Sequence, residues 1–412
     1  MQSLRIRGGK PLTGELRISG GKNAALPVLA STVMFRDVCE IQDCPNLSDV
    51  DAALEILTYL GAECLRSGST VTVDPRPIDK WQIPEALMCK MRGSVFFMGP
   101  LMARFGQCGM SQPGGCPLGS RPVDFHLRGL EKLGASVLCG ESLQCTGPLV
   151  GNQIELPYPS VGATENLLMA ALGAEGTTTI LNAAQEPEIV CLCDFLRLGG
   201  CKIRGDGTSA IQIESGLPHQ ARMALIPDRM ETATYLCAVA AAGGRADLQN
   251  AQPRHIQSVI EVLRKAGCEI QCEEKSIVIH AGGLHSPGEI TTGPYPDFPT
   301  DAQAPMMAAL LRAEGETRIT EQVFSHRMHH IPALRAMGGR IECFGGTAVI
   351  TGTDRLRGAS VEATDLRGGA ALAVAALAAE DETEIRSMWH LLRGYEDIAG
   401  KLRALGAEVC FG

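Results

Sequence analysis

The sequence is poor in aromatic residues, carries no excess of positive charge and contains no long hydrophobic run. Of its 412 residues, 4% are aromatic, and 46 acidic residues outnumber 37 basic ones. The net charge of −9 argues against a nucleic-acid or anionic-membrane partner. The longest apolar stretch, residues 368–379, is about half of the ~20 residues that cross a bilayer. Because the N-terminal stretch also lacks the apolar core of a signal peptide, we expect a cytoplasmic protein.

The 16 cysteines form no regular disulfide framework, as is usual in a reducing compartment. Cys191 and Cys193 make a C-x-C on an apolar helical pattern, but no nearby residue completes a ligand set. We therefore predict no metal and no cofactor. Cys116 differs from the others, since it stands among glycines and prolines in "SQPGGCPLGSRPVDFH", five residues before Arg121. An exposed thiol near positive charge is typical of a reactive cysteine, whereas most cysteines are small buried hydrophobes.

A phrase resembling "LGAE" recurs six times, each time at the end of a helical pattern. Its first glycines lie roughly 70 residues apart, and they are Gly61, Gly134, Gly199, Gly267, Gly338 and Gly406. Each is expected to cap its helix in the left-handed conformation, and strand-like runs such as 269–281 and 340–352 follow. A second, more apolar helix precedes each phrase and is expected to be buried. The chain is thus predicted to be an α/β protein of six strand–helix–strand–helix–strand–strand units, in two groups of three.

Basic residues stand at many of the predicted helix starts. The buried helices are expected to begin near Lys22, Arg92, Gly162, Arg229, Asp301 and Arg367, and the second helices near Ser48, Arg121, Glu188, Arg254, Arg327 and Arg393. A cation costs ~0.3–1 kcal/mol at a helix N-terminus, so stability alone does not favour this pattern. Either the boundaries are displaced by a turn and the cations reach solvent, or converging N-termini and cations bind phosphate or carboxylate groups. For the whole set we favour the second interpretation.

Eight long motifs then follow in order along the chain. They are "SGGKNAALP", "PGGCPLGSRPVDFH", "SVGATEN", "AAQEPEIV", "PDRMETAT", "FPTDAQAP", "ATDLRGGAAL" and "RGYEDIAGKLRALGA". Together they resemble the UDP-N-acetylglucosamine 1-carboxyvinyltransferases over nearly all of the sequence. The resemblance implies two inverse α/β barrels, each of three repeated βαβαββ units. Residues 22–228 would form the domain with the Cys116 loop, residues 1–21 and 229–412 the second domain, and the active site the cleft between them.

The same resemblance implies an enzyme that moves the enolpyruvyl group of phosphoenolpyruvate to the 3′-hydroxyl of UDP-N-acetylglucosamine and releases phosphate. This addition–elimination through a tetrahedral ketal is the first committed step of peptidoglycan synthesis. The implied partners are these two small molecules, with neither nucleic acid nor membrane, and the oligomeric state stays open.

Site residues follow from the resemblance position by position. Cys116 matches the thiol that fosfomycin alkylates, with a role in proton donation or product release. Asp301 matches the base for the sugar hydroxyl, although an acidic residue there could also cap its helix. Lys22, Arg121 and Arg393 match the cations that hold phosphoenolpyruvate. The remaining matches are Arg92, Arg327 and Arg367 as further cations, Asn23 and Val323 on the sugar side, Arg121, Pro122, Val123, Asp124 and Phe125 with Ser160, Val161 and Gly162 for uridine and diphosphate, and Glu188 near the site.

Two departures and two alternatives remain. Ser48 and Tyr158 stand where some family members carry lysines, which bears on diphosphate affinity. A catalytically silent sugar-nucleotide-binding paralogue is one alternative, although the residues that such a copy would lose are all present. The other is 5-enolpyruvylshikimate-3-phosphate synthase, which lacks the cysteine loop and has a different N-terminal motif in place of "GGKNAALP".

Overall fold

The computed structural model describes residues 3–111, 123–140, 142–324 and 326–412. Within these ranges the chain divides into two compact units. Unit 1 contains the residues up to Ser19 and residues 227–412, and unit 2 contains the described residues from Gly20 to Ile226. The chain therefore passes between the units at 19–20 and again at 226–227.

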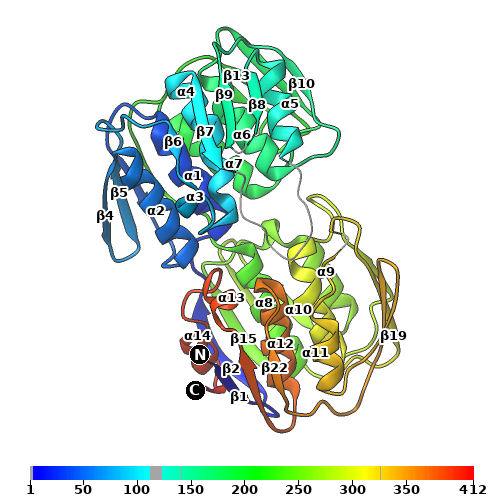
Figure 1. Ribbon diagram of the computed structural model, residues 1–412. Helices are drawn as coiled ribbons and strands as arrows, with labels where there is room; N and C mark the ends of the chain where they lie inside the picture. Colours follow the sequence, from blue (N-terminus) through cyan, green and yellow to red (C-terminus); the bar gives the residue numbers. More distant parts are fainter. Residues whose placement is uncertain (1–2, 112–122, 141, 325) are drawn as a thin grey trace. The chain divides into compact units, whose positions relative to one another are not determined.

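The helices and strands of each unit alternate along the chain as the repeat predicts (Figure 1). Unit 2 comprises α1 (Lys22–Ser31), η1 (Thr32–Met34), β3 (Cys39–Gln42), α2 (Ser48–Leu60), β4 (Glu63–Ser67), β5 (Thr70–Asp74), β6 (Gln82–Ile83), α3 (Glu85–Met88), η2 (Arg92–Phe97), α4 (Met98–Phe105), β7 (Gln107–Ser111), α5 (Asp124–Lys132), β8 (Ser136–Cys139), β9 (Ser142–Thr146), β10 (Gln153–Glu155), α6 (Val161–Leu172), β11 (Thr177–Leu181), α7 (Pro187–Leu198), β12 (Ile203–Arg204), β13 (Ala210–Glu214) and β14 (Ala221–Ala224). Unit 1 comprises β1 (Leu4–Arg7), β2 (Leu12–Arg17), α8 (Arg229–Ala242), β15 (Gly244–Gln249), η3 (Pro253–His255), α9 (Gln257–Lys265), β16 (Glu269–Cys272), β17 (Ser276–Ala281), β18 (Glu289–Thr291), α10 (Thr300–Leu310), β19 (Glu316–Thr320), α11 (Ile331–Ala336), β20 (Arg340–Phe344), β21 (Thr347–Thr351), β22 (Ser360–Glu362), α12 (Leu366–Ala378), β23 (Glu382–Arg386), α13 (Trp389–Leu392), α14 (Ile398–Ala404) and β24 (Glu408–Phe411).

The described strands form six four-stranded sheets with one shared pattern. In each sheet one edge strand is parallel to its neighbour and the other two pairs are antiparallel, as in β10–β11–β13–β12. There Ile154 lies opposite Ile180, which lies opposite Ile211. The βαβαββ repeat and the α/β fold class are thereby confirmed.

Strands from distant parts of the chain complete both units. β1 pairs with β23 and β24, which brings the first and last strands side by side (Figure 1). β2 lies parallel to β15, and in unit 2 the last strand, β14, lies parallel to β3. The first 19 residues thus belong structurally to the C-terminal part of the chain.

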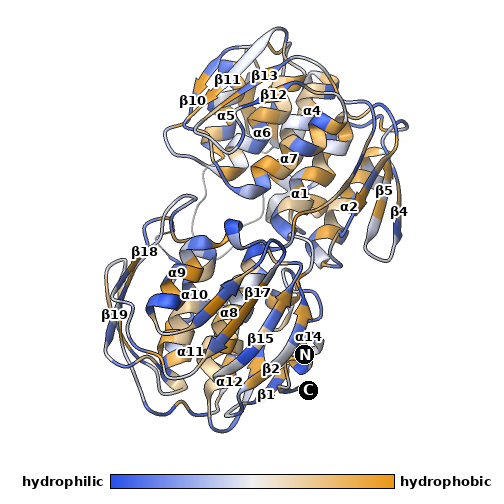
Figure 2. Ribbon diagram, turned by 180° about the vertical axis from the view of Figure 1, so that it is seen from behind, coloured by the Kyte–Doolittle hydropathy of each residue, from blue (hydrophilic) through white to orange (hydrophobic). Residues whose placement is uncertain are grey.

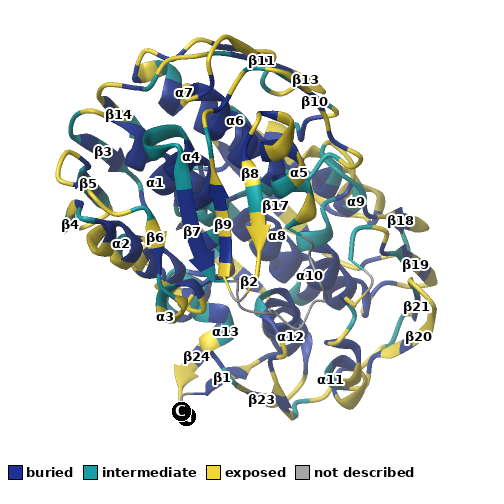
Figure 3. Cartoon of the chain, turned by 45° about the horizontal axis from the view of Figure 1, so that its top comes forward, coloured by how far each residue is buried: buried dark blue, intermediate teal, exposed yellow. Residues whose placement is uncertain are grey.

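Three apolar helices form the centre of each unit. In unit 1, α8, α10 and α12 pack against one another, and in unit 2, α4 packs against α6 while η2 contacts α1 and α6. Figure 3 shows α6, α8, α10 and α12 almost wholly buried, and Figure 2 shows the hydrophobic residues along α6 and α12 that cause this. Gly99 permits the close approach of α4 to α6, since a Cβ there would lie 2.2 Å from the carbonyl oxygen of Asn166. The described part of the chain contains no helix long and apolar enough to span a membrane.

The predicted starts of the inner helices are correct to within one residue. Lys22, Arg92 and Arg229 are the first residues of α1, η2 and α8. Gly162, Asp301 and Arg367 are the second residues of α6, α10 and α12.

Three predicted starts of second helices are wrong. Arg254 lies in η3, before α9, and Arg327 lies four residues before α11. Arg393 follows α13 and precedes α14, whose start is set by the side chain of Asp397, which accepts a hydrogen bond from the Gly400 amide. For these arginines the boundaries were displaced by about a turn.

The predicted glycine caps are confirmed at five of six positions. Gly61, at the end of α2, has a φ of 116°, and Gly134, Gly267, Gly338 and Gly406 also have positive φ. Gly199 has a φ of −74°, because the following Gly200 adopts the left-handed conformation instead, with a φ of 97°.

Candidate active site

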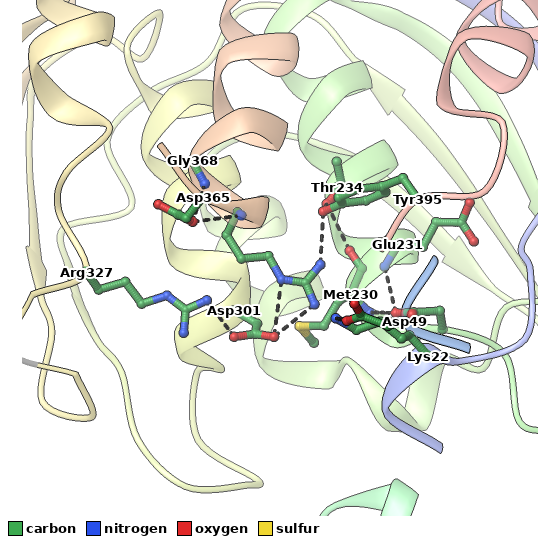
Figure 4. Close-up of polar contacts among 12 residues, drawn as sticks. Lys22, Asp49, Met230, Glu231, Thr234, Asp301, Arg327, Asp365, Gly368 and Tyr395 are labelled. Atoms are coloured by element: carbon green, nitrogen blue, oxygen red, sulfur yellow. Dashed lines mark hydrogen bonds and ion pairs between the residues drawn. The ribbon is translucent and has the colours of Figure 1, made fainter. Parts of the chain in front are cut away.

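In unit 1, the carboxylate of Asp301 is held by two arginines (Figure 4). Arg327 Nη2 donates a hydrogen bond of 2.6 Å to Oδ1. Arg367 donates two to Oδ2, from Nη2 at 2.9 Å and from Nε at 3.2 Å. Arg327 and Arg367 lie 26 and 66 residues after Asp301 in the sequence. The arrangement fixes the plane of the carboxylate.

Burial is unequal across this cluster. The side chains of Arg327 and Arg367 are 3% and 5% exposed, whereas that of Asp301 is 26% exposed. Burial by itself lowers the pKa of Arg367, but the charge of Asp301, with smaller contributions from Tyr395 and Asp228, raises that pKa overall. Arg367 therefore stays charged behind a carboxylate that solvent or a substrate can reach.

Asp301 does not cap its helix. The N-cap position of α10 is Pro299, and no side-chain hydrogen bond caps this helix. The alternative role considered for Asp301 is therefore wrong, and its carboxylate serves the arginines instead.

Aspartates missed in the sequence explain how α8 and α12 tolerate an arginine in the first turn. Asp228 precedes Arg229, and its side chain accepts hydrogen bonds from two α8 amides at 2.7 and 2.9 Å. Asp365 does the same for α12, accepting from the amides of Arg367 and Gly368 at 2.9 Å each. These caps offset the cost of a cation near the N-terminus.

Glu321 organises the loop that carries Val323. Its Oε1 accepts hydrogen bonds from the amides of Val323, at 2.8 Å, and Phe324, at 3.0 Å. Its Oε2 accepts from the hydroxyl of Thr300, at the start of α10. Glu321 thus ties the Val323 loop to the helix of Asp301. Its signal in the sequence is weak, since a glutamate after a strand is common.

Arg393 lies half-buried just after α13, two residues before Tyr395. Tyr395 is 1% exposed, and its hydroxyl accepts a hydrogen bond of 3.1 Å from Arg367 Nη1. The segment that carries Arg393 is therefore joined to the Asp301 cluster through Tyr395.

In unit 2, Lys22 begins α1 and forms an ion pair with Asp49 of α2. Lys22 Nζ lies 3.3 Å from Asp49 Oδ2, and the two side chains are 13% and 7% exposed. Asn23, the next residue of α1, is half-buried. Asp49 was not predicted from the sequence. An ion pair between residues of two different helices leaves no local pattern in the sequence.

The N-terminus of α6 combines Ser160, Val161 and Gly162. Ser160 is the N-cap, and its side chain accepts a hydrogen bond from the Ala163 amide at 3.4 Å. All three predicted residues are partly exposed, so their backbone amides lie at an accessible helix end.

The imidazole of His126 lies beside this turn, since a Cβ on Gly162 would be 3.4 Å from His126 Cε1. Asn166 holds His126, with 2.9 Å between Asn166 Nδ2 and His126 Nδ1. Burial lowers the pKa of His126 to about 4, so the ring is neutral at physiological pH.

The remaining predicted residues lie on turns and helices next to these clusters, in α7, or outside the described ranges. Val123, Asp124 and Phe125 are at the start of α5, with Asp124 exposed, and Glu188 is buried in the first turn of α7. Ser48 begins α2, and Tyr158 is exposed before α6. Cys116, Arg121 and Pro122 lie outside the described residues, and of Arg92 only the backbone position in η2 is described.

Burial governs most other cysteines. Nine of the 15 described cysteines are buried. Burial raises the pKa of Cys191 to about 12 and raises the pKa of Cys193 well above its usual value, so neither is a thiolate at neutral pH. The described residues contain no group of three or more His, Cys, Asp and Glu side chains suited to a metal.

Comparison with known proteins agrees with this fold. Residues 6–402 match the family model of EPSP synthase (3-phosphoshikimate 1-carboxyvinyltransferase). The UDP-N-acetylglucosamine 1-carboxyvinyltransferase of Chlorobium chlorochromatii is 43% identical over 99% of this chain and 98% of its own length. That of Granulibacter bethesdensis is 44% identical over 99% of both chains.

Solved structures show the same fold. The enolpyruvyl transferase NikO from Streptomyces tendae superposes with a TM-score of 0.90 at 25% identity, covering 100% of this chain and 98% of its own. An EPSP synthase from Acinetobacter baumannii gives a TM-score of 0.75 at 19% identity, with full coverage of both chains. Taken with the six repeated sheets, these findings show that the chain belongs to the EPSP synthase family, among the UDP-N-acetylglucosamine 1-carboxyvinyltransferases.

Proposed function

We propose that this protein transfers the enolpyruvyl group of phosphoenolpyruvate to the 3′-hydroxyl of UDP-N-acetylglucosamine, the first committed step of peptidoglycan synthesis. The proposal is supported by relatives of that name that are 42–44% identical over 98–99% of this chain. It is also supported by the retention of Lys22, Cys116, Asp301 and Arg393, which a silent paralogue would be free to lose. The single structural observation that carries it is the Asp301 carboxylate held between two buried arginines.

The reaction begins with addition. Asp301 takes the proton of the 3′-hydroxyl while the sugar oxygen forms a bond to C2 of the enolpyruvate and an acid protonates C3. A base must be oriented and accessible, and both conditions hold for Asp301, whose side chain is 26% exposed while two arginines fix its plane.

Elimination then completes the transfer. A proton leaves C3 of the tetrahedral ketal, and the bond between C2 and the phosphate oxygen breaks, which releases inorganic phosphate. Lys22, Arg121 and Arg393 neutralise the phosphate and carboxylate of phosphoenolpyruvate through both steps. Cys116 serves proton transfer or product release, and a thiol five residues before an arginine in the sequence suits either role.

The sugar nucleotide is held by the helix end and loops on the uridine and diphosphate side. The amides of Val161 and Gly162, next to the N-cap Ser160, suit a diphosphate, because the N-terminus of a helix carries positive partial charge. The Ser160 amide itself donates to the Tyr158 carbonyl oxygen at 2.7 Å. Val123 at the start of α5 belongs with Arg121 to the uridine side, and Val323, tied to α10 through Glu321, to the sugar side. Lysines are absent at Ser48 and Tyr158, so these backbone amides carry more of the diphosphate binding.

A continuous phosphate-release assay tests the proposal. The purified protein is given phosphoenolpyruvate with either UDP-N-acetylglucosamine or shikimate-3-phosphate. Phosphate release that depends on UDP-N-acetylglucosamine supports the proposal. Release with shikimate-3-phosphate alone would move the assignment to EPSP synthase, and binding of UDP-N-acetylglucosamine without release would identify a silent paralogue.

A further inference from the structure

A chain of hydrogen bonds connects the Asp301 cluster to the interior of unit 1. Arg367 Nη1 lies 3.1 Å from the hydroxyl of Tyr395, which lies 2.7 Å from the hydroxyl of Thr234. Thr234 in turn donates a hydrogen bond of 2.9 Å to the carbonyl oxygen of Met230 in α8. Figure 4 shows Thr234 and Tyr395 meeting on the side of the cluster away from Arg327.

The direction of each bond in this chain follows from the number of hydrogens. Thr234 has one hydroxyl hydrogen, and the Met230 carbonyl, which can only accept, takes it. Thr234 must therefore accept from Tyr395, whose own hydrogen is then used. The Tyr395 oxygen is left with lone pairs alone, which makes it an acceptor for the guanidinium of Arg367. If Thr234 donated to Tyr395 instead, its oxygen and the Met230 carbonyl oxygen would face each other as two acceptors.

Burial stabilises this donor–acceptor direction of the hydrogen-bond chain. Tyr395 is 1% exposed, Thr234 and Arg367 are each 4% exposed, and water therefore cannot easily replace a lost partner. The ring of Tyr395 also packs near the guanidinium of Arg367, 5.7 Å from ring centroid to Cζ. Three hydrogen bonds, two to Asp301 Oδ2 and one to the Tyr395 hydroxyl, leave the guanidinium little freedom to rotate.

Tyr395 also fixes the segment that carries Arg393. The amide of Tyr395 donates to the Leu391 carbonyl oxygen at 3.0 Å. The intervening Gly394 packs directly against Leu366, since a Cβ there would lie 2.6 Å from the Leu366 side chain. Leu366 is the residue before Arg367, so the backbone around Arg393 and the start of α12 are in contact.

We propose that Tyr395 is a positioning residue that orients Arg367, and through it the Asp301 carboxylate, relative to Arg393. This inference rests on the proposed function, since it assigns Tyr395 a role in the same transfer. Tyr395 itself touches neither substrate. Its effect is on the orientation of the base and the cations in the transition state, so its loss lowers kcat more than it raises KM.

The test compares Tyr395 with Tyr235, a second buried tyrosine of unit 1. Tyr395→Phe keeps the ring and removes the hydroxyl that accepts from Arg367. Tyr235→Phe is the matched control, because Tyr235 is also 1% exposed but its hydroxyl has no hydrogen-bond partner among the residues that the structure describes. Tyr235 lies next to Thr234 in α8, so both substitutions alter the same core.

We expect Tyr395→Phe to lower kcat ~10-fold or more, because a hydrogen bond to a buried charge is lost. The KM values for both substrates should change less than ~3-fold, and Tyr235→Phe should leave kcat unchanged. The variant Thr234→Val should also lower kcat, and adding it to Tyr395→Phe should cause no further loss, since both act through one hydrogen-bond chain. Additive losses, or equal losses in the two tyrosine variants, would overturn the inference.

Crystal structures of the same variants separate this inference from the proposed function. In Tyr395→Phe we expect the Arg367 guanidinium to rotate away from Asp301 Oδ2, and in Tyr235→Phe to stay in place. If Arg367 keeps both hydrogen bonds to Asp301 Oδ2 in Tyr395→Phe, the positioning role is wrong. This conclusion does not depend on which substrate receives the enolpyruvyl group in the wild-type protein. Wild-type protein that shows no transfer to UDP-N-acetylglucosamine would contradict the proposed function, while the rotation of Arg367 would still decide the inference.

Discussion

Replacing Asp301 with asparagine keeps the size of the side chain but removes the negative charge shared by two buried arginines. The nitrogens of Arg327 and Arg367 lie 2.6 and 2.9 Å from its oxygens. Opposite charges about 4 Å apart are worth ~4 kcal/mol in the partly polar environment of a protein. Breaking a buried pair costs ~3–5 kcal/mol, because the partner stays charged and unpaired. Since the amide oxygen can still accept a hydrogen bond, we expect unit 1 to lose ~3 kcal/mol of unfolding free energy.

The same substitution should nearly abolish turnover. An amide cannot accept the proton of the sugar hydroxyl, and general-base catalysis contributes ~10²–10⁴-fold, so kcat should fall by that factor. Urea denaturation followed by circular dichroism measures the first effect, and the phosphate-release assay measures the second. Asp354→Asn is the control, because Asp354 is exposed in unit 1, and it should change neither value.

The two measurements contradict different parts of the reasoning. Unchanged unfolding free energy in Asp301→Asn would refute the charge cluster. A large loss of stability with near-normal kcat would show that Asp301 supports the structure without acting as the base.

Three further predictions concern other parts of the chain. Burial lowers the pKa of His126 from 6.5 to about 4, so protonation below pH 6.5 favours the unfolded wild-type chain. As the pH falls from 6.5 to 4, the unfolding free energy of wild type should therefore drop by ~3 kcal/mol relative to that of His126→Gln. A difference in urea denaturation that does not change with pH would contradict this. Gly99→Ala should lower the unfolding free energy by ~1–3 kcal/mol, because the new Cβ would lie 2.2 Å from a backbone oxygen of α6. Gly282→Ala is the control, since a Cβ there meets open space and should lower the unfolding free energy little. Equal unfolding midpoints for the two variants would refute the α4–α6 contact. One fosfomycin molecule should alkylate Cys116 and stop turnover, which peptide mass spectrometry and the phosphate-release assay can show. Cys116→Asp should keep some turnover and resist the drug, because a carboxylic acid can still donate a proton. Full sensitivity of that variant to fosfomycin would count against the assignment.

The repeat and the inner helices could be predicted from the sequence because their signals are local. An apolar run preceded by a polar or basic residue marks a helix start within one turn, as at Lys22 and Arg229. A glycine after a helical pattern marks its end, except where two glycines compete, as at Gly199 and Gly200. Both signals lie within a few residues of the feature that they predict.

The candidate site was only partly predictable because its contacts join distant residues. Asp301 and its arginines are 26 and 66 residues apart, and no spacing rule connects them. Arg393 was placed at a helix start, but the α13 turn and the Asp397 cap move that start beyond it. Tyr395 had a usable signal that was missed, since a tyrosine two residues after a predicted active-site arginine is notable in a chain with 5 tyrosines.

The proposed function requires that the 3′-oxygen of the sugar nucleotide receives the enolpyruvyl group. The most direct measurement is the identity of the product formed from phosphoenolpyruvate and UDP-N-acetylglucosamine, by mass spectrometry and by proton and carbon NMR. We predict a vinyl ether on the 3′-oxygen, formed in equal amount to the released phosphate. An unmodified sugar nucleotide, or an enolpyruvyl group found only on shikimate-3-phosphate, would contradict the account.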